Sequence, residues 1–274
     1  MFDSREMISQ RCTRLREKVC VVTGAGQGIG RATAFRLAAE GAQVIVAERN
    51  ESSAVATREQ IREFGGVAHA IVSDLSSFRG ACDLMEHCDS EFGHVDVLVN
   101  CVGGTIWWQP FHEYTENQIM LELERSLLTA LWSCRAAIPH MLKHSCGSII
   151  NLGSSVSKGG LYRTPYAVSK GGIEVLTRTL AAEYGMYGIR VNGVSPGTVV
   201  VSDRSTSRLV VRPGVEVEAA PGTEQRVDEA RTHQSNSLGR SGRPEEIAGA
   251  IAFLASNDSS FVTGHMIDCS GGIF

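Results

Sequence analysis

The sequence contains no apolar run long enough to cross a membrane. Its longest stretch without a polar side chain, 247–255, is about half of what a bilayer crossing needs. The first eighteen residues mix arginines with acids and lack the apolar centre of a secretory signal. We therefore expect a cytoplasmic protein without a membrane partner.

An excess of either charge is also absent, because 26 lysines and arginines stand against 30 aspartates and glutamates in 274 residues. Nucleic-acid binding needs a clustered positive surface, so we exclude a nucleic-acid partner. The eight cysteines form no CxxC pair, which predicts buried reduced thiols and no metal site. The length fits one large α/β domain.

Short runs rich in valine and isoleucine alternate with amphipathic stretches of helix length. Near-continuous apolar runs are typical of strands covered on both faces, and helices between them favour parallel connections. We predict an α/β fold with a single Rossmann-type, doubly wound parallel sheet of about seven strands and helices on both faces. The predicted strands are 18–23, 43–48, 67–74, 95–100, 147–154, 190–195 and 265–269.

No internal repeat or second domain is visible. We divide the chain into a polar N-terminal extension, 1–17, and one dinucleotide-binding catalytic domain, 18–274. Within the domain, 198–224 holds two Pro-Gly pairs and no clear period, which is typical of a long substrate loop or lid. Thr115 and Gln118 have the spacing of a helix capping box.

A glycine-rich turn follows the first predicted strand and precedes a helix. Its sequence is Thr23-Gly24-Ala25-Gly26-Gln27-Gly28-Ile29-Gly30. Glycines here let the backbone approach a pyrophosphate, whose charge is met by the free N–H groups of the helix. A phosphate-loop nucleotidase is excluded, because no Gly-Lys-Ser/Thr closes the turn. A tight strand-to-helix loop without a ligand is the alternative.

An acid, Glu48, ends the second predicted strand. A carboxylate at this place can accept hydrogen bonds from the adenosine ribose and repel a 2′-phosphate, so we predict NAD rather than NADP. Arg49 follows directly and could instead contact that phosphate, which keeps NADP open. A solvated acid at a strand end is the explanation without a ligand.

Tyr166 and Lys170 are four residues apart at the start of a predicted helix, so they share one face. A nearby cation favours the phenolate and lowers a tyrosine pKa from about 10, as a base working near neutrality requires. Ser154 ends the fifth predicted strand, at the sheet edge where such folds bind ligands. Its hydroxyl could donate to a reacting oxygen or simply cap a turn.

The TGxxxGxG turn, Glu48, Ser154 and the Tyr166/Lys170 pair, in this order, resemble the classical short-chain dehydrogenase/reductase family over about residues 18–272. The resemblance implies that Tyr166 accepts the alcohol proton while hydride passes to the nicotinamide, with Lys170 on the nicotinamide ribose and Ser154 on the reacting oxygen. Ser126 stands where the family usually has a proton-relay asparagine, which leaves that step open. The implied cofactor-binding residues are Gly24, Gln27, Gly28, Ile29, Gly30, Glu48, Asp74, Leu75, Asn100, Val102, Tyr166, Lys170, Pro196, Gly197 and Thr198.

Three segments, 103–111, 125–132 and 161–166, resemble the cis-dihydrodiol dehydrogenases of aromatic-acid catabolism. This resemblance implies oxidation of a carboxylated cis-dihydrodiol to a catechol. Trp107, and beside it Trp108, could pack on a cyclohexadiene ring, and Arg163 could bind the carboxylate as a bidentate fork. Structural packing explains a single tryptophan more often than ligand contact does, and a solvated or interface arginine explains Arg163 equally well. Weaker candidates for the carboxylate are Arg125, Arg204, Arg208 and Arg212.

Three other functions stay open at this point. The substrate could be a 2,3-dihydrodiol of the p-cumate type, with its carboxylate on another carbon, or an unrelated secondary alcohol. A non-catalytic NAD-binding scaffold is the alternative from a different class, which Ser126 favours and the intact Ser154, Tyr166 and Lys170 disfavour. The family resemblance also implies a homotetramer that packs the helices of Ser126 and Tyr166 and the last strand.

Overall fold

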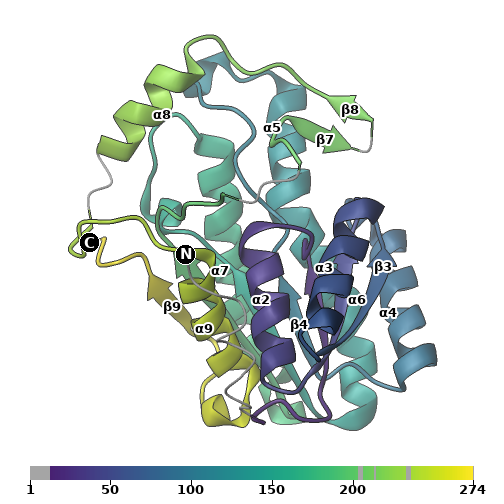
Figure 1. Cartoon of the computed structure of the whole chain (residues 1–274). Helices are drawn as coiled ribbons and strands as arrows, with labels where there is room; N and C mark the ends of the chain where they lie inside the picture. Colours follow the sequence, from purple (N-terminus) through teal and green to yellow (C-terminus); the bar gives the residue numbers. More distant parts are fainter. Residues whose placement is uncertain (1–12, 203–205, 213, 233–235, 274) are drawn as a thin grey trace.

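The computed structural model describes residues 13–202, 206–212, 214–232 and 236–273. Seven parallel strands form one sheet in the order β3-β2-β1-β4-β5-β6-β9, which confirms the predicted fold class (Figure 1). Each predicted strand end lies within two residues of the observed one. The strands are β1 (Val19–Thr23), β2 (Gln43–Glu48), β3 (Val67–Val72), β4 (Val97–Asn100), β5 (Gly147–Leu152), β6 (Ile189–Pro196) and β9 (Met266–Cys269).

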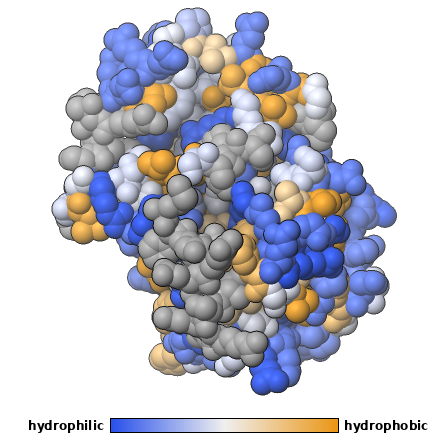
Figure 2. Space-filling view, in the orientation of Figure 1, coloured by the Kyte–Doolittle hydropathy of each residue, from blue (hydrophilic) through white to orange (hydrophobic). Residues whose placement is uncertain are grey.

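Helices cover both faces of this sheet, because side chains in a strand alternate between two apolar layers. In β1, for example, Val22 faces the layer under α2 and α9, whereas Val21 faces the layer under α4 and α6. Figure 2 shows a hydrophilic outer surface over α3, whose Ala54 and Ile61 are buried in the first layer. The long helices are α2 (Gly28–Ala39), α3 (Glu51–Glu63), α4 (Phe78–Phe92), α5 (Glu116–Leu123), α6 (Thr129–His144), α7 (Thr164–Tyr184), α8 (Thr223–Thr232) and α9 (Pro244–Ala255). None of the described helices is both long enough and apolar enough to span a bilayer.

The segment 198–224 has more regular structure than its sequence predicts. It holds a two-stranded antiparallel hairpin, β7 (Val210–Arg212) and β8 (Val215–Glu216), and its end enters α8 (Figure 1). Strands of two or three residues are too short to show a periodic pattern, so the sequence suggested only a loop. The capping box of Thr115 and Gln118 is confirmed at the start of α5.

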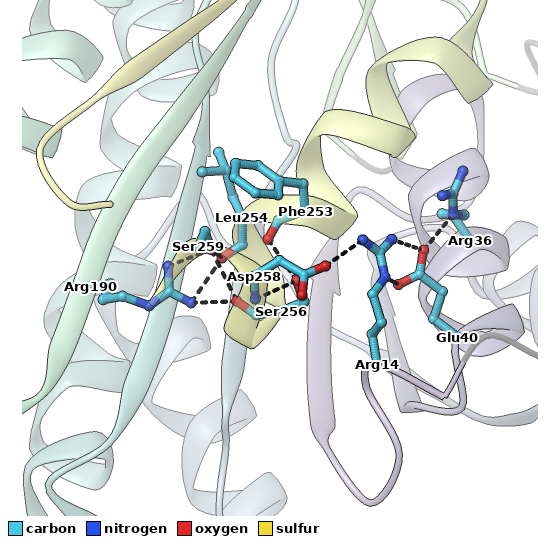
Figure 3. A network of polar contacts seen from close by, with 9 residues as sticks. All are labelled: Arg14, Arg36, Glu40, Arg190, Phe253, Leu254, Ser256, Asp258 and Ser259. Atoms are coloured by element: carbon cyan, nitrogen blue, oxygen red, sulfur yellow. Dashed lines mark hydrogen bonds and ion pairs between the residues drawn. The ribbon is translucent and has the colours of Figure 1, made fainter. Parts of the chain in front are cut away.

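The part of the predicted N-terminal extension that the structure describes, 13–17, packs against the domain. Leu15 is buried, and its N–H donates to the carbonyl of Glu40. The guanidinium of Arg14 donates to both carboxylate oxygens of Glu40, at 2.9 and 2.6 Å, and to Asp258 at 2.9 Å (Figure 3). Arg36 reaches the same carboxylate at 2.6 Å. Residues 13–17 therefore join the end of α2 to the turn after α9.

Replacing Glu40 by alanine is expected to lower the free energy of unfolding by about 2–3 kcal/mol, because the carboxylate is buried between two guanidinium groups that would lose their partner. Its side chain is only 2% exposed. Urea denaturation followed by circular dichroism measures the change. Glu59→Ala is the matched control, since that acid is 48% exposed and pairs with its neighbour Arg58. A loss for Glu40→Ala no larger than the control's would contradict the assignment.

Candidate active site

A cleft lies at the carboxyl edge of the sheet, beside β1 and β4, where the strand order reverses. Ligands of doubly wound sheets bind at this point, because the loops from the two halves diverge there. The glycine-rich turn, the end of β2, the loops after β4, β5 and β6, and the start of α7 line it. The cleft therefore collects most of the residues that the sequence singled out.

The glycine-rich turn brings backbone, rather than side chains, to the cleft. Gly24 and Gly28 have φ angles of +62° and +55°, a region that favours glycine. A Cβ on Gly30 would lie 2.2 Å from the carbonyl oxygen of Gly24, so no side chain fits there. Gly28, Ile29 and Gly30 line the cleft where α2 begins. Its free N–H groups suit an anion such as a pyrophosphate.

Glu48 also lines the cleft, with its carboxylate fixed by backbone amides. Oε2 accepts from the N–H of Gly26 at 3.2 Å, and Oε1 accepts from Arg49 and Asn50 at 2.9 and 3.2 Å. A fixed acceptor of this kind suits the hydroxyls of a ribose. The guanidinium of Arg49 is instead bonded to the carbonyls of Val210 and Val211 in β7, at 2.6 and 2.7 Å.

Most of the other predicted cofactor residues line the same cleft. They are Gln27, Asp74, Leu75, Val102, Pro196, Gly197 and Thr198. Asn100 is an exception, because the structure does not bring it into the cleft. Its buried Nδ2 donates to Asn151 at 2.8 Å and to the sulfur of Cys134, so it bridges β4 and β5.

Ser154, Tyr166 and Lys170 come together in the cleft. Pro165 lies in the first turn of α7, as its missing N–H allows, so Tyr166 and Lys170 follow one helical turn apart. The hydroxyl of Ser154 is hydrogen-bonded to Tyr166 and also accepts from the N–H of Val156 at 3.3 Å. Lys170 Nζ lies 5.7 Å from the centre of the Tyr166 ring and donates to the carbonyl of Leu152 at 2.6 Å.

The structure corrects the predicted electrostatics of this pair. Burial raises the pKa of Tyr166, and the hydrogen bond from Ser154 and the charges of Arg163 and Arg208 partly offset the rise. Burial also lowers the pKa of Lys170 to about 8. An ammonium in such surroundings is itself destabilised, so it does not dominate the ionisation of the phenol as the sequence suggested.

Ser126 lies behind the cleft wall, in a π-helical turn (Glu124–Leu128) that the sequence did not predict. It is buried, and its Oγ accepts from the N–H of Gly104 at 3.4 Å. A Cβ on Gly103 would lie 3.2 Å from Lys170 Nζ and 3.8 Å from Ser126 Oγ, so both groups flank this glycine. Turns of this type are frequent at functional sites.

Trp108 lines the cleft, whereas Trp107 is not among the lining residues. Trp107 is buried in an apolar cluster with Ile106 and Tyr114, and its indole N–H donates to the carbonyl of Glu218 at 2.9 Å. Trp107 was therefore the wrong member of the pair. The choice depends on a partner more than a hundred residues away, which no local pattern reveals.

Arg163 is stacked on Trp108, with its guanidinium carbon 4.3 Å from the ring centre. It lines the cleft, and its Nε is buried without a hydrogen-bond partner among the described residues. Burial lowers its pKa, so an incoming anion would relieve an unfavourable state.

The weaker arginine candidates for binding the carboxylate differ in where they lie. Arg125 and Arg208 line the cleft, and Arg125 donates to the carbonyls of Arg208 and Val210. Arg212 pairs with Val215 in the hairpin, and Arg204 lies outside the described residues. Further lining residues, which the sequence did not reveal as candidates, are Val199, Val201, Thr206, Ser207, Val211 and Val227.

The cysteines of the described chain are all free thiols: Cys20, Cys82, Cys88, Cys101, Cys134, Cys146 and Cys269. Cys12 lies outside the described residues. No group of three or more histidine, cysteine, aspartate or glutamate residues within those ranges could hold a metal ion.

Comparison with known proteins covers nearly the whole chain. A family model described as enoyl-(acyl carrier protein) reductase, of the short-chain alcohol dehydrogenase type, matches residues 24–273. The 1,6-dihydroxycyclohexa-2,4-diene-1-carboxylate dehydrogenase of Acinetobacter baylyi is 43% identical over 94% of this chain and 97% of its own length. The 2,3-dihydroxy-2,3-dihydro-p-cumate dehydrogenase of Pseudomonas putida is 34% identical over 97% of each chain. A solved 7α-hydroxysteroid dehydrogenase, complexed with NADH and 7-oxo glycochenodeoxycholic acid, superposes with a TM-score of 0.80 at 30% identity, covering 100% of this chain and 98% of its own.

Proposed function

Because the chain belongs to the short-chain dehydrogenase/reductase family, we propose that it oxidises a carboxylated cis-dihydrodiol, of the 1,6-dihydroxycyclohexa-2,4-diene-1-carboxylate type, to a catechol with NAD. The observation that carries the proposal is Arg163, a guanidinium stacked on Trp108 in the same cleft as Ser154 and Tyr166. It offers a site for an acidic, ring-shaped alcohol. The name of the relative from Acinetobacter baylyi supports the same substrate class.

The residues present fit a nicotinamide dinucleotide. The glycine turn would hold the pyrophosphate, Glu48 would accept hydrogen bonds from the adenosine ribose, and Lys170, which lines the same cleft, would hold the second ribose. When bound, this group supplies a hydride acceptor. NAD is preferred over NADP because Glu48 repels a 2′-phosphate and because Arg49 is bonded to the carbonyls of β7.

The proton of the reacting hydroxyl goes to the phenolate oxygen of Tyr166, which lies beside Ser154 in the cleft. Ser154 then remains beside the oxygen as it becomes a carbonyl, where its hydroxyl donates a hydrogen bond to that oxygen. Lys170 donates a hydrogen bond to the carbonyl of Leu152. In its protonated form, its positive charge stabilises the phenolate of Tyr166. Ser126, behind Gly103, is the proposed entry of a proton path to Lys170.

The chemistry of the substrate determines the product. The ring carbon that carries the carboxylate has no hydrogen, so oxidation takes place at the neighbouring carbinol carbon. The product is a β-keto acid, which loses carbon dioxide and aromatises to a catechol. No residue dedicated to decarboxylation is needed.

A 2,3-dihydrodiol of the p-cumate type is the second candidate substrate, favoured by the relative from Pseudomonas putida. There the oxidised ring only tautomerises and keeps its carboxylate. Incubation of the protein with NAD and a panel of carboxylated cis-dihydrodiols distinguishes the two. We expect NADH, catechol and carbon dioxide in equal amounts from the 1-carboxylate. NADH without carbon dioxide would support the second candidate, and no NADH from any diol would favour a non-catalytic scaffold.

Replacing Glu48 by glutamine is expected to lower the preference for NAD over NADP by at least about tenfold, because the variant no longer opposes a 2′-phosphate with a like charge. The ratio of kcat/KM for the two cofactors measures the effect. Glu51→Gln is a matched control, as this acid is exposed in the first turn of α3. An unchanged ratio would remove Glu48 from cofactor discrimination.

We also propose a homotetramer. Exposed apolar side chains support contacts between copies at α5, which leads into the turn of Ser126, and at α7, which carries Tyr166 and Lys170. They are Met120, Val168 and Val175, at 52%, 59% and 61% exposure. Sedimentation equilibrium tests it, and a monomer at micromolar concentration would reject it.

A further inference from the structure

Glu122 is an acid that the proposed chemistry does not use, although it is buried near the end of α5 with 0% exposure. Oε1 accepts two backbone N–H groups, from Ile106 at 2.7 Å and Trp107 at 3.1 Å. Oε2 is buried and has no hydrogen-bond partner in the described part of the chain. Burial raises the pKa of Glu122 to about 7. Burial of a carboxyl group costs free energy unless hydrogen bonds compensate for it.

The two amides belong to the segment 104–108, of which Gly104, Thr105 and Trp108 line the cleft. We call this segment the substrate wall. Trp107 is held at three points: its N–H by Glu122, its carbonyl by the hydroxyl of Tyr114 at 2.8 Å, and its indole by Glu218. Its neighbour Trp108 lines the cleft and carries the guanidinium of Arg163 on its ring. The backbone conformation at Trp107 therefore determines where the side chain of Trp108 lies.

Glu122 accepts the hydrogen bonds of both amides in the interior of the protein. Ile106 and Trp107 belong to a buried apolar cluster with Tyr114 and Ala220. The charges of Arg125 and Arg208 also act on Glu122 and lower its pKa, against the larger effect of burial. Hydrogen bonds to an ionised oxygen are about twice as strong as neutral ones, and a buried N–H without any acceptor costs about 1–3 kcal/mol. Two such groups would otherwise be left unsatisfied beneath the substrate wall.

We infer that Glu122 is a positioning residue, which fixes the backbone of Ile106 and Trp107 so that Trp108 and Arg163 form the wall that receives the substrate's ring and carboxylate. Glu122 does not touch the substrate and acts through this segment. The inference rests on the proposed function, because it assigns the support of the proposed carboxylate site.

The kinetic test compares Glu122→Leu, which has a similar volume but no acceptor, with Glu122→Gln, which keeps an oxygen for the two amides. For the leucine variant we expect KM for the carboxylated diol to rise at least about tenfold, while kcat changes less and the Kd for NAD stays within about twofold. The glutamine variant should stay within about threefold of wild type. Glu116→Leu, an exposed acid on the same helix, is the matched control.

A second readout needs neither substrate nor cofactor. The chain has three tryptophans, so in a Trp132→Phe background only Trp107 and Trp108 report. We expect acrylamide to quench their fluorescence more strongly in Glu122→Leu than in the parent, and equally in Glu122→Gln and the parent.

Unchanged quenching and unchanged KM in Glu122→Leu would overturn the inference. If the leucine variant does not fold, Glu122→Asp decides by the same two measurements, because its carboxylate is one methylene too short to reach both amides. A wild-type protein that oxidises no carboxylated diol would reject the proposed function, whereas the quenching experiment would still test the anchoring of Trp107 by Glu122.

Discussion

Tyr166→Phe is expected to reduce the rate of NAD reduction about 1,000-fold or more, because the variant keeps the ring but lacks the group that accepts the alcohol proton. Stopped assays with the carboxylated diol measure the loss. NAD affinity, followed by fluorescence titration, should stay within about twofold of wild type, since the turn of Gly24 to Gly30 and the carboxylate of Glu48 are unchanged.

Tyr187→Phe is the matched control for this change, because Tyr187 is 47% exposed and lies outside the cleft. Residual activity of Tyr166→Phe above about a tenth of wild type would show that another group takes the proton. Loss of NAD binding in the same variant would instead point to damaged packing at the start of α7.

Arg163→Leu is expected to lower kcat/KM for a carboxylated diol about 100-fold, which corresponds to roughly 3 kcal/mol for a charge-assisted contact. The loss should be confined to acidic substrates. A neutral cis-diol, such as one derived from an unsubstituted arene, should lose less than about threefold, because leucine still covers the ring of Trp108.

Arg178→Leu serves as the control, since Arg178 lies on the same helix, is 60% exposed and pairs with Glu174 on the surface. Equal losses for acidic and neutral diols in Arg163→Leu would mean that the arginine supports the cleft rather than binding a carboxylate. Arg163→Lys refines the result: it keeps the charge but not the planar fork, so we expect partial recovery.

The elements that could be predicted from sequence are those whose signal is local. The strand runs, the glycine turn, and the helical spacing of Tyr166 and Lys170 all depend on residues within a few positions of one another. Their arrangement in one cleft followed from the rule that parallel strands bring their carboxyl ends to one edge.

Other features depend on partners distant in the chain and were missed for that reason. The indole of Trp107 donates to the carbonyl of Glu218, which is distant in the chain, and the role of Glu122 appears only when α5 meets the loop after β4. The pKa of Lys170 is set by burial among several elements, which the sequence does not display. The hairpin β7–β8 was missed because its strands are too short.

The carbonyl of Val210 accepts hydrogen bonds from two arginines that are distant in the chain, Arg49 after β2 and Arg125 before α6. If Arg49 were redirected to bind a 2′-phosphate on the ribose, one of these two hydrogen bonds would be lost. Changing the coenzyme preference by engineering would then also disturb β7, which lines the cleft through Val211, so a second compensating change in β7 would have to accompany the first.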